Sequence, residues 1–482
     1  GIPEPRELDL PKGDALMALS SRGELALSLG PWNLLDGGLL GRSSLAGGPP
    51  REVLERVVYA DWQPDGSALA VVRRNGPEWR IEYPIGKSLY KTANLILGMR
   101  LSPNGERLAF VELVQNEALL STIAATDGKK VLAVIGKGTF YCPALSWSPN
   151  GREIWFSSFD TEKAGIVLAV GLDGKQRTVA TLPGQNRLFD ISRDGKMLLT
   201  TSNQRLGILY GSEGEPNERD LSWLDTTLLS SLGADGKTIV FSEIGEGGGH
   251  NRSIYRRSTD GSPAVRLAEG IAGAVSPDEK WVTAYRANAK QKVSLVPIGP
   301  GEEIPVLVDG LEDRLGNVVA WLPDGHRYLV RGHQPGKQGR IFVWDSTSRK
   351  LTAVSPEGTA FNDLLPAPDG SRFLAQGPDG NWFLYQTDGG APRPLPGIGT
   401  DERPVNWDDD GKSVYLTGTT EGAKSFRVSR LDLATSRKVF WKEIKPAKPV
   451  DSVFNLRITP DGRSYAYNYS RTLSDLYVVE GL

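Results

Sequence analysis

Few residues of this chain stand at the spacing that chemistry requires. Gly-Lys-[Ser/Thr] triplets begin, among other places, at Gly236 and Gly411, as they would in a phosphate-binding loop. Such a loop needs another glycine five residues earlier, and Ser231 and Asn406 occupy those positions. The sequence therefore predicts no nucleotide site at either triplet.

Motifs for phosphoryl transfer and covalent catalysis are also absent. The chain has no His-Arg-Asp, Asp-Phe-Gly, Val-Ala-Ile-Lys or Gly-x-Ser-x-Gly sequence. Its three histidines, His250, His326 and His333, do not have the spacing of a zinc site, and His326 follows a turn where exposure is expected. We therefore expect no catalytic residue, no metal and no cofactor, and predict that this chain by itself is not an enzyme.

One loop has the composition of a recognition loop. Residues 245–252 read Gly-Glu-Gly-Gly-Gly-His-Asn-Arg, and the candidate binding residues are Glu246, His250, Asn251 and Arg252. Exposed backbone N–H groups beside a histidine and an arginine can hold an anion or a peptide carboxylate. The alternative interpretation is a flexible connection between two strands.

The elements that must position this loop come from an internal repeat of about 44 residues. An apolar run, a Ser/Leu/Thr-Pro-Asp-Gly motif, a basic residue and a second apolar run recur along the chain. The fourth residues of the eleven motifs are Gly23, Gly66, Gly105, Gly151, Gly195, Gly236, Glu279, Gly325, Gly370, Gly411 and Gly462.

Each motif has the chemistry of a turn between two strands. Proline presets φ, Asp or Asn hydrogen-bonds to the backbone, and glycine accepts a left-handed conformation. The flanking runs, such as residues 108–111 and 238–241, are rich in β-branched and aromatic residues. A second turn, as at Leu172-Asp173-Gly174, follows 20 to 25 residues later. Four antiparallel strands per repeat predict β-propeller blades, whereas β-sandwich domains would repeat near every 100 residues.

Tryptophans support this interpretation. Trp62, Trp147, Trp321 and Trp407 share one repeat position, which predicts packing between blades. Four others lie outside that register and are candidates for exposure on a binding face: Trp32, Trp79, Trp382 and Trp441.

About eleven blades exceed the four to eight of a single ring, so we predict two rings. Repeats one to five would occupy residues 1–222 and repeats six to eleven residues 223–482. In the last repeat we expect strands up to Ile458, at 464–469 and at 476–479, with a fourth strand missing. Residues 4–10 alternate like a lone strand and are predicted to complete that blade beside residues 475–480. The alternative is that they end a blade of a longer parent protein.

The Ser-Pro-Asp-Gly-[Lys/Arg] motif resembles the TolB-type, WD40-like propeller repeat over essentially the whole chain. A narrower resemblance is to the C-terminal propeller region of bacterial eukaryotic-like Ser/Thr protein kinases. The segments that carry it are residues 21–30, 218–225, 241–249, 459–467 and 473–482. This resemblance implies the sensor or scaffold region of a receptor-type kinase, detached from its kinase domain, in an extracytoplasmic location.

Composition limits the partners. The net charge of −2 and the pI of about 6.1 make nucleic acid an unexpected partner. No run of 18 apolar residues occurs, so no membrane span is expected in this chain. The function we infer is non-catalytic binding of a protein or small molecule on a loop face.

Two alternatives stay open for the function. One is an enzyme with an active site in the central channel, which needs His, Asp, Arg or Tyr residues projecting inward at one blade position. The sequence gives no such register. The other is the gating propeller of a peptidase.

Overall fold

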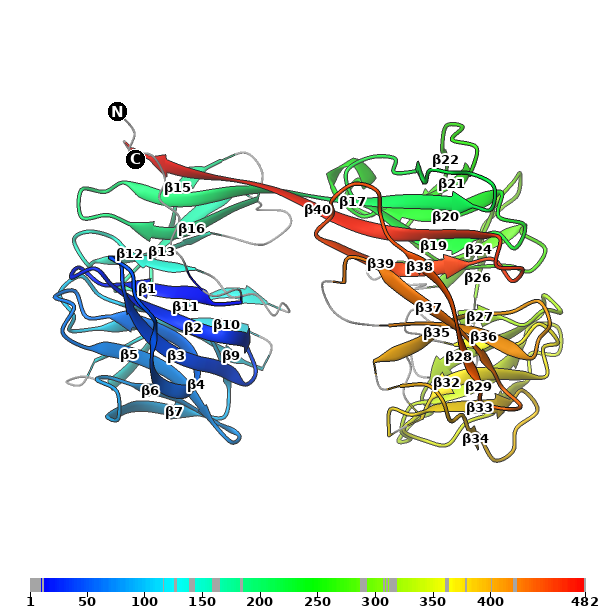
Figure 1. Ribbon diagram of the computed structural model, residues 1–482, viewed down its shortest axis with the longest axis horizontal. Coiled ribbons are helices and arrows are strands. Elements are labelled where there is room, and N and C mark those ends of the chain that lie inside the picture. The colour runs from blue at the N-terminus through cyan, green and yellow to red at the C-terminus, as the bar shows by residue number, and fades with distance from the viewer. Residues whose placement is uncertain are drawn as a thin grey trace. The chain divides into compact units, whose positions relative to one another are not determined.

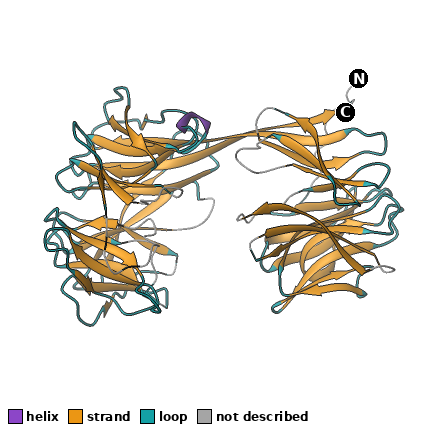
Figure 2. Cartoon of the chain, turned by 180° about the vertical axis from the view of Figure 1, so that it is seen from behind, coloured by secondary structure: helices purple, strands orange, loops and turns teal. Residues whose placement is uncertain are grey.

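The computed structural model describes residues 10, 13–115, 117–124, 128–137, 144–157, 165–182, 185–286, 293–306, 308, 311, 319–359, 364–377, 379–399, 401–418 and 423–480. Within these residues the chain is all-β, and its one helical element is the 3-10 turn η2 (Glu246–Gly248) (Figures 1 and 2). No helix in the described residues has the length and apolar character needed to cross a membrane. The predicted all-β propeller fold is confirmed, since four-stranded antiparallel sheets follow one another along the chain.

The repeated motif forms the predicted turn. At Gly66, φ is +71°, and its N–H donates to the carbonyl of Gln63 at 2.7 Å. The Asp65 carboxylate accepts the N–H of Ser67 at 2.8 Å. Glycine is required here because a Cβ disfavours this left-handed conformation. Each such turn reverses the chain between the first and second strands of a blade.

The chain divides into two compact units. Unit 1 comprises Gly1–Asn203 with Leu473–Leu482, and unit 2 comprises Gln204–Thr472. The assignment of residues 1–222 and 223–482 to separate rings stays a prediction.

In unit 1 the first seven strands form one sheet, in which β4 pairs with β3 through its first half and with β5 through its second half. Two four-stranded sheets follow. The strands are β1 (Ala15–Leu19), β2 (Glu24–Asn33), β3 (Gly37–Ser44), β4 (Arg51–Trp62), β5 (Leu69–Asn75), β6 (Glu78–Glu82), β7 (Ser88–Thr92), β8 (Leu95–Leu101), β9 (Leu108–Val114), β10 (Glu117–Ala124), β11 (Gly128–Lys137), β12 (Leu145–Trp147), β13 (Glu153–Ser157), β14 (Ile166–Gly171) and β15 (Gln176–Thr181).

Unit 2 contains five consecutive four-stranded sheets. Their strands are β19 (Thr227–Leu232), β20 (Thr238–Glu243), β21 (Ser253–Ser258), β22 (Val265–Glu269), β23 (Ile271–Val275), β24 (Trp281–Tyr285), β25 (Val293–Pro297), β26 (Ile304–Pro305), β27 (Val319–Trp321), β28 (Arg327–Gly332), β29 (Arg340–Asp345), β30 (Leu351–Ala353), β31 (Leu365–Pro366), β32 (Arg372–Gln376), β33 (Trp382–Gln386), β34 (Arg393–Pro394), β35 (Glu402–Trp407), β36 (Ser413–Gly418), β37 (Phe426–Asp432) and β38 (Lys438–Ile444). The first strand of each sheet contacts the first strand of the next, so these strands lie innermost.

The remaining sheet combines strands from distant parts of the sequence. It runs β16 (Gln185–Ile191), β17 (Met197–Ser212), β40 (Ser464–Val479), β39 (Ser452–Ile458), with β18 (Arg219–Asp220) beside β17. In unit 2, β39 contacts both β19 and β35, so the innermost strands form a closed cycle. Unit 2 is therefore closed by a blade made from β39, β40, β17 and β18.

The predicted break between strands 464–469 and 476–479 is wrong, because β40 is one continuous strand. Residues 470–475 contain neither glycine nor proline to turn the chain, and β17 pairs alongside. The predicted strand at residues 4–10 lies, apart from Leu10, outside the described residues.

Close packing holds β17 against β40. A Cβ at Gly207 would lie 2.4 Å from the Tyr469 ring, and one at Gly211 would lie 2.5 Å from the Tyr465 ring. The two tyrosine rings therefore cover the backbone of β17 at positions where any side chain would displace them. Asn468, which is fully buried, donates to the carbonyl of Gly207 at 3.0 Å. These contacts fix the pairing of the two strands within unit 2.

Tryptophans follow the predicted packing only in part. The four at the shared repeat position are buried, as predicted: Trp62, Trp147, Trp321 and Trp407. Two of the four candidates for exposure are buried as well: Trp79 and Trp382. These two lie on the third strands of their blades, which also face a neighbouring sheet, so burial is not confined to one register.

Deleting residues 473–482 tests the contribution of β40 to unit 1. The deletion removes the strand beside β17 and the packing of Val479, which contacts the cluster around Trp155. We expect unit 1 to lose about 2 kcal/mol, a fall of roughly 6 °C in Tm, while unit 2 keeps its transition. Differential scanning calorimetry of the full chain and the truncated chain measures this. Leu476→Gln, at an exposed position of β40, is the control, and equal transitions in all three proteins would contradict the assignment.

Glu218 gives the closing blade of unit 2 a pH dependence. It accepts hydrogen bonds from the Tyr467 hydroxyl at 2.9 Å, and burial raises its pKa above the ordinary value. A raised folded-state pKa favours folding at acid pH, and this contribution is lost as the pH rises through that pKa. Glu218→Gln cannot ionise, so its Tm should approach that of wild type at pH 4 and exceed it at pH 7. Glu213→Gln, in an exposed position nearby, should show no such change; a Tm difference for Glu218→Gln that is constant with pH would contradict the prediction.

Candidate functional site

The predicted recognition loop, residues 245–252, joins β20 to β21. Its backbone donors already bind a carboxylate of the same chain. Asp225 accepts the N–H of Glu246 at 3.1 Å and the N–H of Gly247 at 3.2 Å. An external anion at these two donors would have to displace Asp225.

Glu243 ties the same loop to the preceding segment. Its buried carboxylate accepts the N–H groups of Leu224 at 3.0 Å and Thr226 at 3.3 Å, and the hydroxyl of Thr227. Residues 218–225 and 241–249, which carry the kinase-like resemblance, are thus hydrogen-bonded to each other. They form one local structure rather than two independent loops.

The four candidate binding residues of the loop are exposed. Asn251 donates to the Glu269 carboxylate at 2.9 Å, and Arg252 adopts φ of +61°. Binding by Glu246, His250, Asn251 and Arg252 stays a prediction.

A polar cluster lies where the first strands of unit 1 meet. Arg100 on β8 donates from Nε to the carbonyl of Leu145 at 3.1 Å and from Nη2 to that of Phe189 at 2.9 Å. Its guanidinium also lies 3.2 Å from Asp61 and 3.5 Å from Asp190. One side chain therefore contacts three other innermost regions: β4, β12 and β16.

The ionisable residues of this cluster share one repeat position. Asp61, Arg100 and Asp190 each stand three residues before the second residue of a turn motif. The inference that no blade position carries a register of inward-projecting His, Asp, Arg or Tyr residues is wrong for unit 1. Counting back from the turn finds it, but the acid and base types alternate between blades and do not repeat.

Electrostatics favour the charged form of Arg100. Burial alone would lower the pKa of Arg100, but Asp61 and Asp190 outweigh it and raise that pKa. Burial raises the pKa of Asp61, against the opposing effect of Arg100. Because the guanidinium is engaged by carbonyls and carboxylates, it joins strands and has little capacity left for a ligand.

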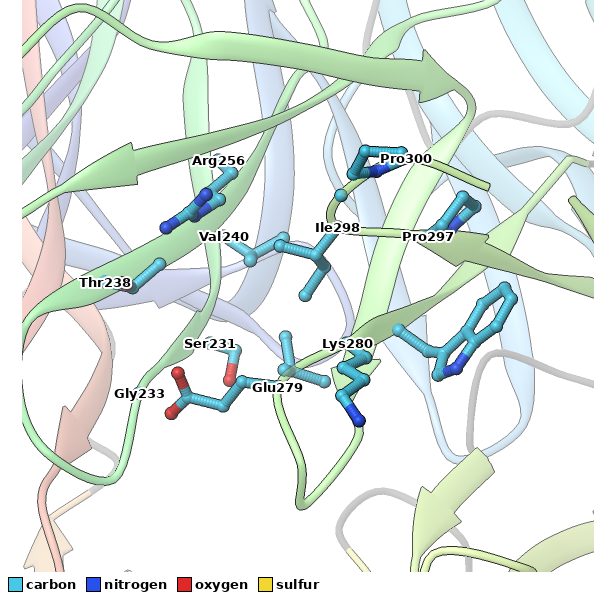
Figure 3. A pocket seen from close by; sticks show the side chains of 13 residues that line it. Ser231, Gly233, Thr238, Val240, Arg256, Glu279, Lys280, Pro297, Ile298 and Pro300 are labelled. Carbon is cyan, nitrogen blue, oxygen red and sulfur yellow. The ribbon is translucent and has the colours of Figure 1, made fainter. Parts of the chain in front are cut away.

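Unit 2 has a cavity of about 390 Å³ between the sheet β19–β22 and the sheet β23–β26 (Figure 3). Its apolar lining is formed by Val240, Val275, Trp281, Pro297, Ile298 and Pro300. Its polar lining includes Ser231, Thr238, Arg256, Glu279 and Lys280. We call this cavity the inter-blade pocket.

Glu279 is the unusual residue of the inter-blade pocket. It occupies the turn position that holds glycine in the other ten motifs, and its φ is +55°. Its carboxylate crosses to the neighbouring blade, where Oε1 accepts the N–H of Ala234 at 3.3 Å. No linear motif marks Glu279 as a functional residue, although the one missing glycine in the repeat is a signal in the sequence.

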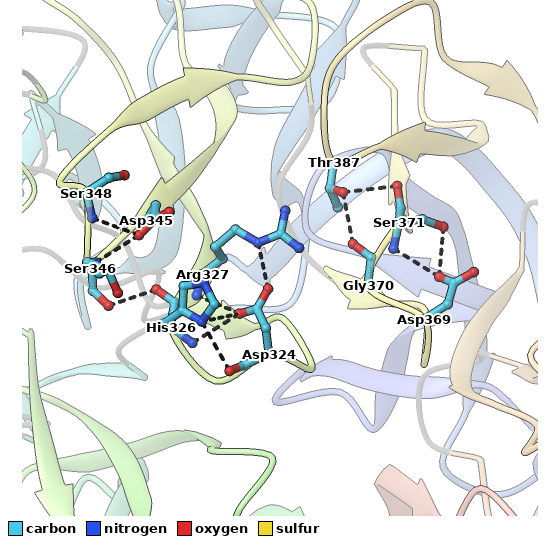
Figure 4. A network of polar contacts seen from close by, with 11 residues as sticks. Asp324, His326, Arg327, Asp345, Ser346, Ser348, Asp369, Gly370, Ser371 and Thr387 are labelled. Atoms are coloured by element: carbon cyan, nitrogen blue, oxygen red, sulfur yellow. Dashed lines mark hydrogen bonds and ion pairs between the residues drawn. The ribbon is translucent and has the colours of Figure 1, made fainter.

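In two other turns, the aspartate carboxylate forms its hydrogen bonds within its own turn (Figure 4). Asp324 accepts the N–H groups of His326 and Arg327, and pairs with the Arg327 side chain at 2.6 Å. Asp369 accepts both the N–H and the hydroxyl of Ser371. His326 is exposed, as predicted. Glu279 differs because its carboxylate lines a pocket between two blades.

The matches of this chain to known proteins lie among solved structures. No family model and no curated protein matches the chain. Among solved structures, the tricorn protease is 12% identical with a TM-score of 0.37, over 98% of this chain and 62% of that chain. TolB from Acinetobacter baumannii is 12% identical with a TM-score of 0.24, over 87% of this chain and 83% of that one. A puromycin hydrolase is 16% identical with a TM-score of 0.35, over 67% of this chain and 57% of that one.

These likenesses concern the fold alone, and the β-propeller assignment rests on the four-stranded sheets described above. The narrower resemblance to kinase propellers receives no support from them. The chain spans 62% of the tricorn protease chain that it matches.

The prediction that this chain is not an enzyme is wrong as an inference from its motifs. The matched structures include a protease and a hydrolase, each at low identity. Linear motifs are a poor guide here, because an active site in a propeller can draw single residues from several blades. The meeting of Asp61, Arg100 and Asp190 shows that single residues of several blades can converge.

Replacing Arg100 tests its role in joining the strands of unit 1. Arg100→Met should leave the buried Asp61 carboxylate without its cation and destabilise unit 1 by about 3 kcal/mol. Arg177→Met is the matched control, since that arginine forms an exposed ion pair with Glu153 and should cost less than about 1 kcal/mol. Urea unfolding of the full chain measures both values, and equal effects of the two substitutions would contradict the role given to Arg100.

Proposed function

We propose that this chain is a ligand-binding β-propeller and that the inter-blade pocket of unit 2 is its binding site. The volume of about 390 Å³ lies within the range of small-molecule sites. The combination of an apolar wall with a few charged and hydroxyl groups is also typical of such sites. The ligand is therefore a small molecule, or a short segment of a protein, held between two blades.

Glu279 carries the proposal. A residue with a side chain at positive φ costs on the order of 1 kcal/mol relative to an unstrained position, and glycine would avoid this cost. Ten of the eleven turns use glycine. The carboxylate is retained at a turn that lines the pocket, and strained residues cluster at ligand sites.

A sensor role belongs to the same proposal. Residues 218–225 and 241–249 resemble kinase-associated propellers, and the hydrogen bonds of Asp225 and Glu243 join them at one end of β20. The inter-blade pocket lies at the other end of β20, beside Thr238. Ligand binding between the blades and contact with a protein partner at the loop would then use opposite ends of one blade. An extracytoplasmic location follows if the parent protein is a receptor-type kinase.

A substitution that fills the pocket tests the proposal. A Cβ at Gly299 would meet no atom within 4 Å, so Gly299→Trp adds bulk to the pocket without a backbone clash. We expect ligands found with the wild-type chain in a ligand-observed NMR screen of dipeptides and small carboxylic acids to bind the variant at least tenfold more weakly. The Tm should be unchanged.

Lys350→Trp is the matched control, because it adds the same ring at an exposed turn of unit 2 that does not line the pocket. Its ligand affinities should equal those of wild type. Ligands that bind Gly299→Trp as tightly as wild type would place the binding site elsewhere.

A further inference from the structure

Arg256 is a cation without a partner beside the inter-blade pocket. It lies on β21 with an exposed side chain, and within the described part of the chain its guanidinium has no hydrogen bond or ion pair. A guanidinium presents paired N–H donors that match a carboxylate. Arg100, in contrast, is engaged by two carbonyls and two carboxylates. Arg256 is therefore available to a ligand and Arg100 is not.

Glu279 is an anion in the same pocket whose carboxylate can accept further hydrogen bonds. The one hydrogen bond that its carboxylate forms among the described residues, from the N–H of Ala234, is 3.3 Å long and engages Oε1. The adjacent cation Lys280 lies 3.7 Å from Asp278 of its own turn. The second oxygen of Glu279 can therefore accept a donor from a ligand, and the Ser231 hydroxyl lies beside it (Figure 3).

Apolar side chains line the pocket together with the two charges. Val240 and Ile298 belong to the same lining as Arg256 and Glu279 (Figure 3). Val240 is buried, and its side chain offers no group that hydrogen-bonds. A ligand that satisfies the whole pocket has opposite charges at its two ends and an apolar body.

We propose that the inter-blade pocket binds a dipolar ligand, a short apolar peptide or amino-acid derivative, with its ammonium at Glu279 and its carboxylate at Arg256. This inference rests on the proposed function. An anion alone would leave Glu279 facing apolar atoms of the ligand, and a cation alone would leave Arg256 unused. The two charges thus select molecules in which both ionic groups are free.

Four related ligands and two variants test the proposal by isothermal titration calorimetry on the full chain. The ligands are leucyl-leucine, its N-acetyl form, its C-terminal amide and the doubly blocked form. With wild type, each single block should weaken binding about tenfold. With Glu279→Gln, acetylation should have little further effect, and with Arg256→Gln, amidation should have little further effect, because each variant removes the partner of the blocked group.

Controls separate binding from folding. Arg256→Gln should keep the wild-type Tm, since the Arg256 guanidinium forms no hydrogen bond or ion pair with the described part of the chain. Arg266→Gln, on β22 and outside the pocket lining, should leave all four affinities unchanged. A variant with a lowered Tm is replaced by Arg256→Lys, which keeps the charge and should restore sensitivity to amidation.

Each outcome decides between the two claims. If all four ligands bind wild type equally and Gly299→Trp abolishes binding, the inter-blade pocket is the binding site, but the proposal that it selects a dipolar ligand is wrong. If binding survives Gly299→Trp, the proposed site itself is wrong. If leucyl-leucine does not bind wild type, or if its blocked forms bind more tightly, the dipolar proposal is overturned.

Discussion

The pairing of β17 with β40 is the interaction on which both units depend. Bringing residues near 207 beside residues near 469 closes a loop of over 250 residues, which costs about 5 kcal/mol in chain entropy. Burial of aromatic side chains offsets this cost, since each contributes roughly 2 kcal/mol. Tyr465, Tyr467 and Tyr469 are all buried on β40. Once these strands pair, the first strands of unit 2 complete their cycle and every inner edge has a neighbour.

The glycines of β17 show how this pairing is made specific. Gly207 and Gly211 leave the space that the rings of Tyr469 and Tyr465 occupy, so a shift of one residue would place side chains where the rings lie. Asn468 reinforces the arrangement, because its side chain donates to carbonyls of both Gly207 and Thr227. A buried amide with all its donors satisfied tolerates one alignment of the strands.

Two arginines illustrate how the surroundings assign a role to one type of side chain. Arg100 lies among the innermost strands of unit 1, where carbonyls and carboxylates use its donors. Arg256 lies on a third strand at the edge of a pocket, where no group of the described chain engages it. The first therefore joins strands, and the second is available for recognition. A similar contrast separates Asp324, which closes its own turn, from Glu279, which reaches the next blade.

The sequence by itself determined the features that rest on local interactions. The turn at Gly66 and its copies, the strands flanking them and the burial of Trp407 follow from residue types a few positions apart. These patterns sufficed for the propeller fold, because every blade except the one that contains β17 and β40 is built from neighbouring hairpins.

Only the tertiary structure decided which distant segments pair and which charged residues remain unpaired. β40 is continuous where it pairs with β17, a strand more than two hundred residues earlier in the chain. Asp61 and Asp190, more than a hundred positions apart, both contact Arg100. The pocket likewise cannot be predicted from the sequence, because Arg256 and Glu279 come from different blades. Their availability to a ligand depends on the side chains that surround them in the folded chain. Local propensity carries no information about such contacts, since their free energy appears only when the whole ring closes.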